Sequence, residues 1–167
     1  MQPMIVQRDE QPYIGRRESI TMTEFAQVAD HLPAMATRLG ERGVPIAGPP
    51  FFRYKVIDMS AEMVIEAGIP VDGPVEPEPP AFADTLPAGR YATVSHIGHP
   101  DELMAVTARL LDWGRDQGVT WDMTPTAEGE VWGARLEILM TDPADEPDMH
   151  KWQTVLMFRL ADDQPEA

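Results

Sequence analysis

The stretch GRYATVSHIGHPDELMAVTARLLDWGRDQGV, residues 89–119, decides the fold because it passes from a strand pattern directly into a helix pattern. Residues 90–97 are rich in β-favouring side chains, which predicts a strand. Pro100 suits the first position of a helix, and two acidic residues follow it in the first turn. Apolar residues then recur on one helical face up to a glycine cap: Leu103, Val106, Leu110 and Trp113, with Gly118.

The first half of the chain shows the same order of elements. A capping box from Thr21 to Glu24 precedes an apolar pattern that predicts one helix over about residues 23–42, ending at Gly43. Pro33 lies inside this pattern, so it should kink or split the helix. The remaining strands are predicted at residues 13–20, 52–58, 63–71, 135–141 and 152–160. The chain therefore predicts two β-α-β-β units.

Such a duplication predicts an α+β fold with an antiparallel sheet, two main helices and a central ligand cleft, because similar units pack about a pseudo-twofold axis. We expect one domain over residues 1–167, with its units at about 11–71 and 90–161. The proline-rich residues 72–89 between them favour an irregular linker, and residues 162–167 form an acidic tail.

The composition limits the classes of function. Thirteen Lys and Arg against 28 Asp and Glu give a formal net charge of −15, so we expect neither nucleic acid nor a membrane as a partner. The absence of cysteine excludes disulfides and thiolate sites. No apolar run reaches the ~20 residues of a membrane span, and no signal-peptide pattern opens the chain. A cytoplasmic monomer or homodimer is expected.

Several segments, in their order and spacing, resemble the GyrI-like small-molecule-binding domains. The strand-to-helix passage quoted above is similar to part of that family's second half. PPFFRYKVID and MVIEAGIPV, at residues 49–58 and 63–71, resemble the first-half hairpin of that family. ARLEILMTDPADEPDMHKWQTVLMFRL, at residues 134–160, resembles its closing hairpin. The resemblance implies the effector-binding fold of multidrug-responsive transcription activators. The family also contains gyrase inhibitors and hydrolases that open cyclopropane rings.

Glu137 is the leading site candidate. It lies in mid-strand, on the face opposite three apolar residues that we expect to pack on the helices: Leu136, Ile138 and Met140. In a cleft, desolvation would raise the pKa of Glu137 and favour a cationic or proton-donating partner. The resemblance implies a pocket glutamate at this position. The alternative is a wet strand face on which Glu137 pairs with Arg135.

Two further polar residues are candidates. Tyr54 lies in the comparable strand of the first half, so its hydroxyl would meet a ligand across the pseudo-twofold from Glu137, or the ring only packs in the sheet. Glu66 would add a second carboxylate to the cleft, or lie on the solvent face of its strand. Two carboxylates on one cavity would support acid/base hydrolysis.

Trp132 and Trp152 are candidate walls of the pocket because flat rings suit varied apolar and cationic ligands. Leu139 completes the candidate ligand-binding set. Many relatives carry an aromatic residue at its position, so the resemblance predicts weaker aromatic caging there. No helix-turn-helix precedes Tyr13, so we expect a stand-alone domain without direct control of transcription.

Other constellations are absent from the sequence. The four histidines are scattered, so no metal site is expected. The sequence also has no glycine-rich loop that would bind a phosphate, so no cofactor is expected. The sequence therefore predicts a module that binds a small hydrophobic or cationic compound. The alternatives are a cyclopropane-opening hydrolase with Glu137 and Tyr54 as catalytic residues, or a protein inhibitor of the gyrase-inhibitor type. A binding pocket and a hydrolytic pocket use the same residue types, so whether the chain is an enzyme stays open.

Overall fold

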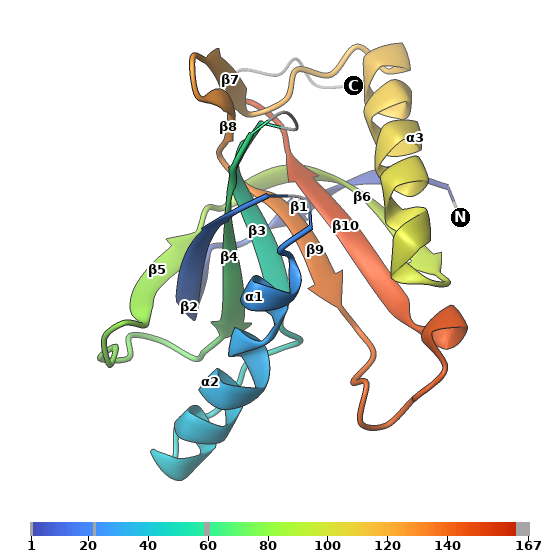
Figure 1. The fold of residues 1–167 in the computed structure, drawn as a ribbon. Helices are drawn as coiled ribbons and strands as arrows, with labels where there is room; N and C mark the ends of the chain where they lie inside the picture. The colour runs from blue at the N-terminus through green and yellow to red at the C-terminus, as the bar shows by residue number, and fades with distance from the viewer. Residues whose placement is uncertain (1, 22, 59–60, 163–167) are drawn as a thin grey trace.

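Strands dominate the fold and form one antiparallel sheet (Figure 1). The computed structural model describes residues 2–21, 23–58 and 61–162. The strands are β1 (Met4–Arg8), β2 (Gln11–Ile20), β3 (Phe51–Ile57), β4 (Met63–Pro70), β5 (Phe82–Leu86), β6 (Gly89–Ile97), β7 (Met123–Thr126), β8 (Gly129–Trp132), β9 (Arg135–Leu139) and β10 (Gln153–Arg159). The helices are α1 (Ala26–Ala29), α2 (His31–Glu41) and α3 (Leu103–Asp116), with 3₁₀ turns at Pro100–Glu102 and Met149–Lys151. Within the described ranges, no helix is both long and apolar enough to cross a membrane.

The strand order confirms the predicted α+β fold with an antiparallel sheet. It runs β1-β6-β10-β9-β3-β4-β2-β5, so the β9–β3 pair at the centre joins two halves of equal make-up. Two strands lie in the half of the sheet formed by the other half of the sequence. The N-terminal strand β1 pairs with β6, and β5, which precedes β6 in the chain, pairs with β2. The seam between the halves is short, with three register pairs from Phe51↔Ile138 to Arg53↔Leu136.

Three elements differ from the sequence-based expectation, and the first is β1, which was not predicted as a strand. The linker is not irregular throughout, since β5 forms inside it as an edge strand. Prolines lie on either side of β5, where their missing N–H groups remove no hydrogen bond between strands. The β7–β8 hairpin was not predicted because its exposed, polar residues give a weak strand pattern. The first helix is split, as expected from Pro33, but the break lies at Asp30, three residues before the proline. Pro33 then lies in the first turn of α2, where its missing N–H is harmless.

The sheet buries side chains on both faces. The helix-side cluster joins the sheet to the helices and includes Val28, Leu39, Phe52, Ile65, Leu110, Leu156 and Phe158. The back-side cluster fills the opposite face and includes Tyr13, Phe51, Tyr91, Leu136, Ile138 and Met157. The expectation that Leu136, Ile138 and Met140 pack on the helices is therefore wrong. The first two lie in the back-side cluster, and Met140 is 47% exposed. Strand alternation separates Glu137 from them but does not say which face bears the helices.

Candidate ligand-binding site

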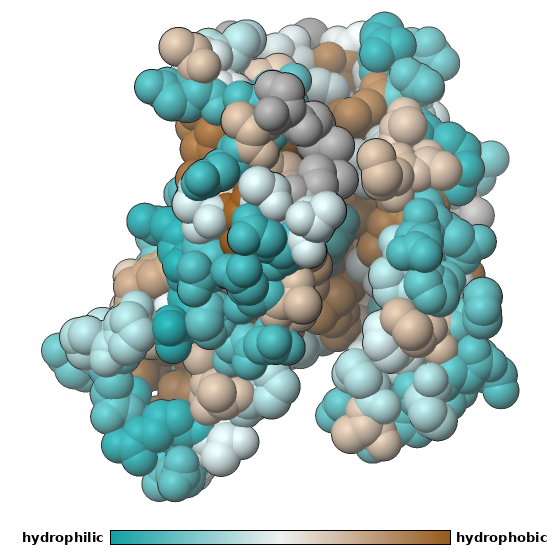
Figure 2. Space-filling view, in the orientation of Figure 1, coloured by the Kyte–Doolittle hydropathy of each residue, from teal (hydrophilic) through white to brown (hydrophobic). Residues whose placement is uncertain are grey.

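The centre of the sheet lies between two blocks of helix (Figure 1). Helices α1 and α2 contact β2 and β4, and α3 contacts β6. Three strands lie between β6 and β4 in the sheet, and therefore between the two blocks of helix. Figure 2 shows this face hollowed between the two blocks, with hydrophobic residues at the back of the hollow. The strands beneath it are β10, β9 and β3.

Glu137 lies on these central strands and points to the helix-bearing face. Its direct neighbours in register are Phe52 on β3 and Leu156 on β10, both in the helix-side cluster. The Tyr54 hydroxyl of β3 donates a hydrogen bond of 2.9 Å to Glu137 Oε1. The two residues thus meet directly across the seam between the halves, whereas the sequence predicted that Tyr54 would meet a ligand there.

Aromatic rings surround this hydrogen bond. Phe25, just before α1, packs edge-on against Phe52 with centroids 4.8 Å apart and stacks on Tyr54 at 6.3 Å. This apolar shell raises the pKa of Glu137 by desolvation, and the Tyr54 hydrogen bond and the positive charge of Arg135 offset only part of the rise. Burial and the negative charge of Glu137 also raise the pKa of Tyr54 well above its ordinary value. The site therefore pairs the Glu137 carboxylate, whose pKa is raised, with the Tyr54 phenol, which stays protonated.

Arg135 lies on the same face of β9 but does not neutralise Glu137 by contact. Among the described residues, no salt bridge joins Glu137 to any cation within 4.0 Å. The Arg135 guanidinium lies over the ring of Trp132 at 4.9 Å and that of Phe158 at 4.7 Å instead. The alternative of a solvent-facing Glu137–Arg135 ion pair is not what the structure contains.

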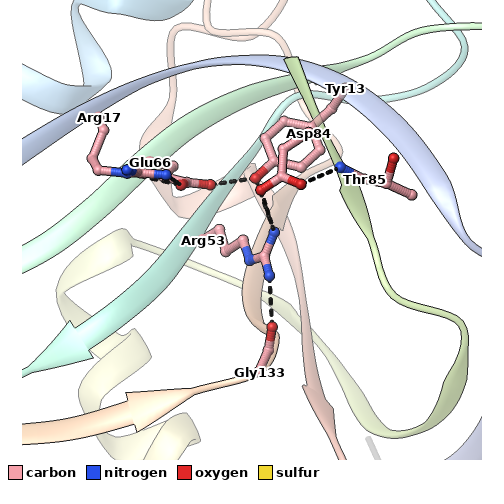
Figure 3. A network of polar contacts seen from close by, with 7 residues as sticks. All are labelled: Tyr13, Arg17, Arg53, Glu66, Asp84, Thr85 and Gly133. Carbon is pink, nitrogen blue, oxygen red and sulfur yellow. Dashed lines mark hydrogen bonds and ion pairs between the residues drawn. The ribbon is translucent and has the colours of Figure 1, made fainter. Parts of the chain in front are cut away.

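Glu66 lies on the other face of the sheet from Glu137, because it is in register with Arg53, whereas Glu137 is in register with Phe52. Figure 3 shows the polar network around Glu66. Glu66 is fully buried, accepts a hydrogen bond from the Tyr13 hydroxyl, and accepts two more from Arg17, at 3.0 and 2.6 Å. Arg53 extends this network by donating to the Tyr13 oxygen at 2.9 Å and to the Gly133 carbonyl at 2.7 Å. Glu66 therefore does not add a carboxylate to the cleft, and the two-carboxylate arrangement is absent.

The other candidates occupy different surroundings. Leu139 lies on the face of Glu137 and packs on the helix-side cluster. Trp132 is only 2% exposed and packs under the Arg135 guanidinium, so little of its ring is available to line a pocket. Trp152 precedes β10, and its indole N–H donates to the Glu146 carbonyl oxygen at 2.7 Å. Trp152 is not among the described side chains that pack on the helix-side cluster around Glu137.

Sequence reasoning did not predict that Phe25 packs on Phe52 and Tyr54, or that Arg135 lies over the rings of Trp132 and Phe158. Phe25 belongs to the apolar helical pattern, which signals core packing and not a site.

Two hollows also lie away from Glu137: one between β6 and α3, lined by Val94 and Trp113, and one beside β2 and β5, lined by Ile14. Glu137 and Tyr54 line neither of them.

The raised pKa of Glu137 has a measurable effect on stability. Where the folded protein holds this proton more tightly than the unfolded chain, the free energy of unfolding falls as pH rises from the ordinary value of 4.5 through the folded pKa. Glu137→Gln removes this loss. The melting temperature of the variant relative to wild type should therefore increase as pH rises from about 4.5 to about 8. Melting curves across that range, with a difference that stays constant, would contradict the raised pKa.

The whole sequence was compared with protein-family models. The family model of the GyrI-like small molecule binding domain matches residues 1–160. No curated protein sequence matches the chain.

Solved structures share the fold at low identity. EcmrR in a complex with DNA gives a TM-score of 0.76 at 18% identity, covering 95% of this chain and 57% of that chain. A hydrolase from Listeria innocua gives 0.65 at 13%, covering 96% of this chain and 92% of that one. SAV2435 bound to tetraphenylphosphonium gives 0.57 at 11%, covering 96% and 94%. At these identities the similarity establishes the fold alone.

The similarity to EcmrR corrects one prediction. The negative net charge excluded nucleic acid as a partner, yet the same fold occurs in a protein that was solved on DNA. This chain spans 57% of the length of that protein chain. The net charge of one domain cannot describe what another segment of a longer chain binds. The exclusion of nucleic acid is therefore contradicted and is not kept.

Proposed function

This chain belongs to the GyrI-like small molecule binding domain family, and we propose that it binds a small hydrophobic cation in the cleft, with Glu137 as the polar anchor. The observation that carries the proposal is a carboxylate set among aromatic rings and held by Tyr54, with no cation of the described chain within ion-pair distance. An ionised carboxylate in such surroundings lacks part of its hydration. A ligand cation would restore the missing partner.

The aromatic rings and the net charge of the chain also favour a cation. Aromatic faces attract positive charge, so the rings of Phe25 and Tyr54 would favour it together with the carboxylate. The formal net charge of −15 raises the local concentration of cations near the whole surface. SAV2435, which has the same fold, was solved with the hydrophobic cation tetraphenylphosphonium.

Titration calorimetry with two ions of the same shape and opposite charge tests this function. Tetraphenylphosphonium and tetraphenylborate bury similar apolar area, so the difference between their affinities reports the charge preference of the site. We expect tetraphenylphosphonium to bind and tetraphenylborate to bind more weakly. Equal affinities, or a preference for the anion, would overturn the proposal of a cation site anchored by Glu137.

Hydrolysis is the second candidate function, and the Tyr54–Glu137 hydrogen bond is the observation that favours it. A carboxylate and a phenol held together would activate a strained cyclopropane ring and direct water to it. Incubation with a reactive cyclopropanoid compound, followed by mass spectrometry of the ring-opened product, separates turnover from binding. Product that forms with wild type and not with Glu137→Gln would establish turnover at this site, and unchanged compound would exclude hydrolysis of that substrate.

A further inference from the structure

Arg135 occupies an unusual position for an arginine in the sheet. Its guanidinium lies 4.7 Å from the centroid of the Phe158 ring, 4.9 Å from that of Trp132 and 5.9 Å from that of Tyr54. It is therefore held by the faces of three aromatic rings, of which Tyr54 is hydrogen-bonded to Glu137. These contacts fix the place of the positive charge beside the cleft.

The N–H donors of Arg135 have no acceptor among the described residues. The two best-buried arginines differ in this respect: Arg53 donates to Tyr13 and Gly133, and Arg159 donates to Asp122, Asp162 and the Ala88 carbonyl. Within residues 2–21, 23–58 and 61–162, no hydrogen bond or ion pair of Arg135 accompanies its ring contacts. Within the described part of the chain, the one buried side-chain nitrogen without a partner belongs to Arg53. The Arg135 nitrogens also have no partner there but are not among these buried atoms, so they are accessible to an incoming group.

We infer that Arg135 is a second polar contact of the ligand and binds a hydrogen-bond acceptor, of which a carboxylate is the strongest. This inference rests on the proposed function and narrows the ligand class. Arg135 and Glu137 are alternate residues of one strand, so their Cα atoms lie about 7 Å apart on the same face. The matching ligand is a hydrophobic zwitterion, or a compound with a donor and an acceptor separated by a similar distance.

The chemistry of the guanidinium favours this role. Its N–H groups form a planar fork that matches the two oxygens of a carboxylate, and stacking on rings leaves the edge of that fork unused. Because the rings already hold the side chain, little conformational freedom is lost when an acceptor binds. Desolvation lowers the pKa of Arg135 from its ordinary value, as expected for a cation that lacks a partner.

Two phosphonium probes of equal length test the inference: pentyltriphenylphosphonium, a cation, and (4-carboxybutyl)triphenylphosphonium, a zwitterion at neutral pH. Wild type should bind the zwitterion roughly tenfold more tightly than the cation, the scale of one charge-assisted hydrogen bond. Arg135→Met keeps an apolar side chain on the rings and removes the donors. In this variant the order should reverse, because the carboxylate of the probe then meets only Glu137.

Each outcome of this titration has a distinct meaning. If neither probe binds wild type, the proposed function fails. If the cation binds and its carboxylate analogue binds no better, or if Arg135→Met changes both affinities by the same factor, the inference fails and the proposed function stands. Arg135→Lys keeps the charge without the fork and should retain only part of the preference for the zwitterion. Melting curves of both variants confirm that the folded protein is being titrated.

Discussion

Replacing Glu137 by glutamine should weaken the binding of tetraphenylphosphonium by about 1–3 kcal/mol, which is roughly 5- to 150-fold. The substitution keeps the shape of the side chain, and its amide oxygen can still accept the hydrogen bond from Tyr54. Only the negative charge is lost. The wild-type carboxylate lies between Phe52 and Leu156 in register, where water cannot fully replace a ligand cation as its partner.

Stability should not fall in the same variant. The carboxylate is desolvated and has no contacting cation among the described residues, so its removal relieves an unfavourable burial. Glu128→Gln is the matched control because it changes the net charge equally at an exposed loop position. Calorimetric titration of the three proteins decides between a local and a general charge effect. Equal losses of affinity in the two variants would show that Glu137 does not contact the ligand.

Replacing Glu66 by glutamine should have the opposite consequence: a large loss of stability, of about 3 kcal/mol. Glu66 is 0% exposed and accepts hydrogen bonds from Tyr13 and from two nitrogens of Arg17. A glutamine amide would turn N–H donors toward one of these donors and would remove the charge that faces Arg17. The estimate is at the low end for a buried pair because Arg17 is 50% exposed and can turn to water.

Thermal unfolding measures this loss directly. For a chain of this length, about 3 kcal/mol corresponds to a melting temperature lower by roughly 6–12 °C. Affinity for tetraphenylphosphonium, measured where the variant is folded, should stay near the wild-type value because Glu66 lies on the other face of the sheet. A variant that melts like wild type would contradict a structural role, and one that loses the ligand would place Glu66 in the site.

The two glutamates show how far the sequence could predict the site. Each lies in mid-strand between apolar neighbours, Ile65 and Ala67 for Glu66, and Leu136 and Ile138 for Glu137. The local patterns are equivalent, so alternation predicts for both that the carboxylate points away from those neighbours. It cannot predict which face of the sheet the neighbours occupy.

The pairing of strands settles that question. Phe52 of β3 is in register with Ala67 on one side and with Glu137 on the other, so these three side chains share the helix-bearing face. Arg53 is in register with Glu66 and Leu136, which share the opposite face. The same local pattern thus gives a carboxylate on the helix-bearing face at β9 and one on the opposite face at β4.

The sequence by itself determined the elements that local periodicity encodes. The apolar stripe of α3, the central strands of both halves and the placing of Tyr54 and Glu137 in comparable strands follow from helical spacing, strand alternation and internal symmetry. The hydrogen bond between these two residues depends on the pairing of β3 with β9 and was not predicted. Tertiary structure alone decided which face carries the helices, where β1 and β5 exchange, and that Arg135 stacks on rings instead of pairing with Glu137. These features depend on contacts between residues far apart in the chain, and no local pattern records such contacts.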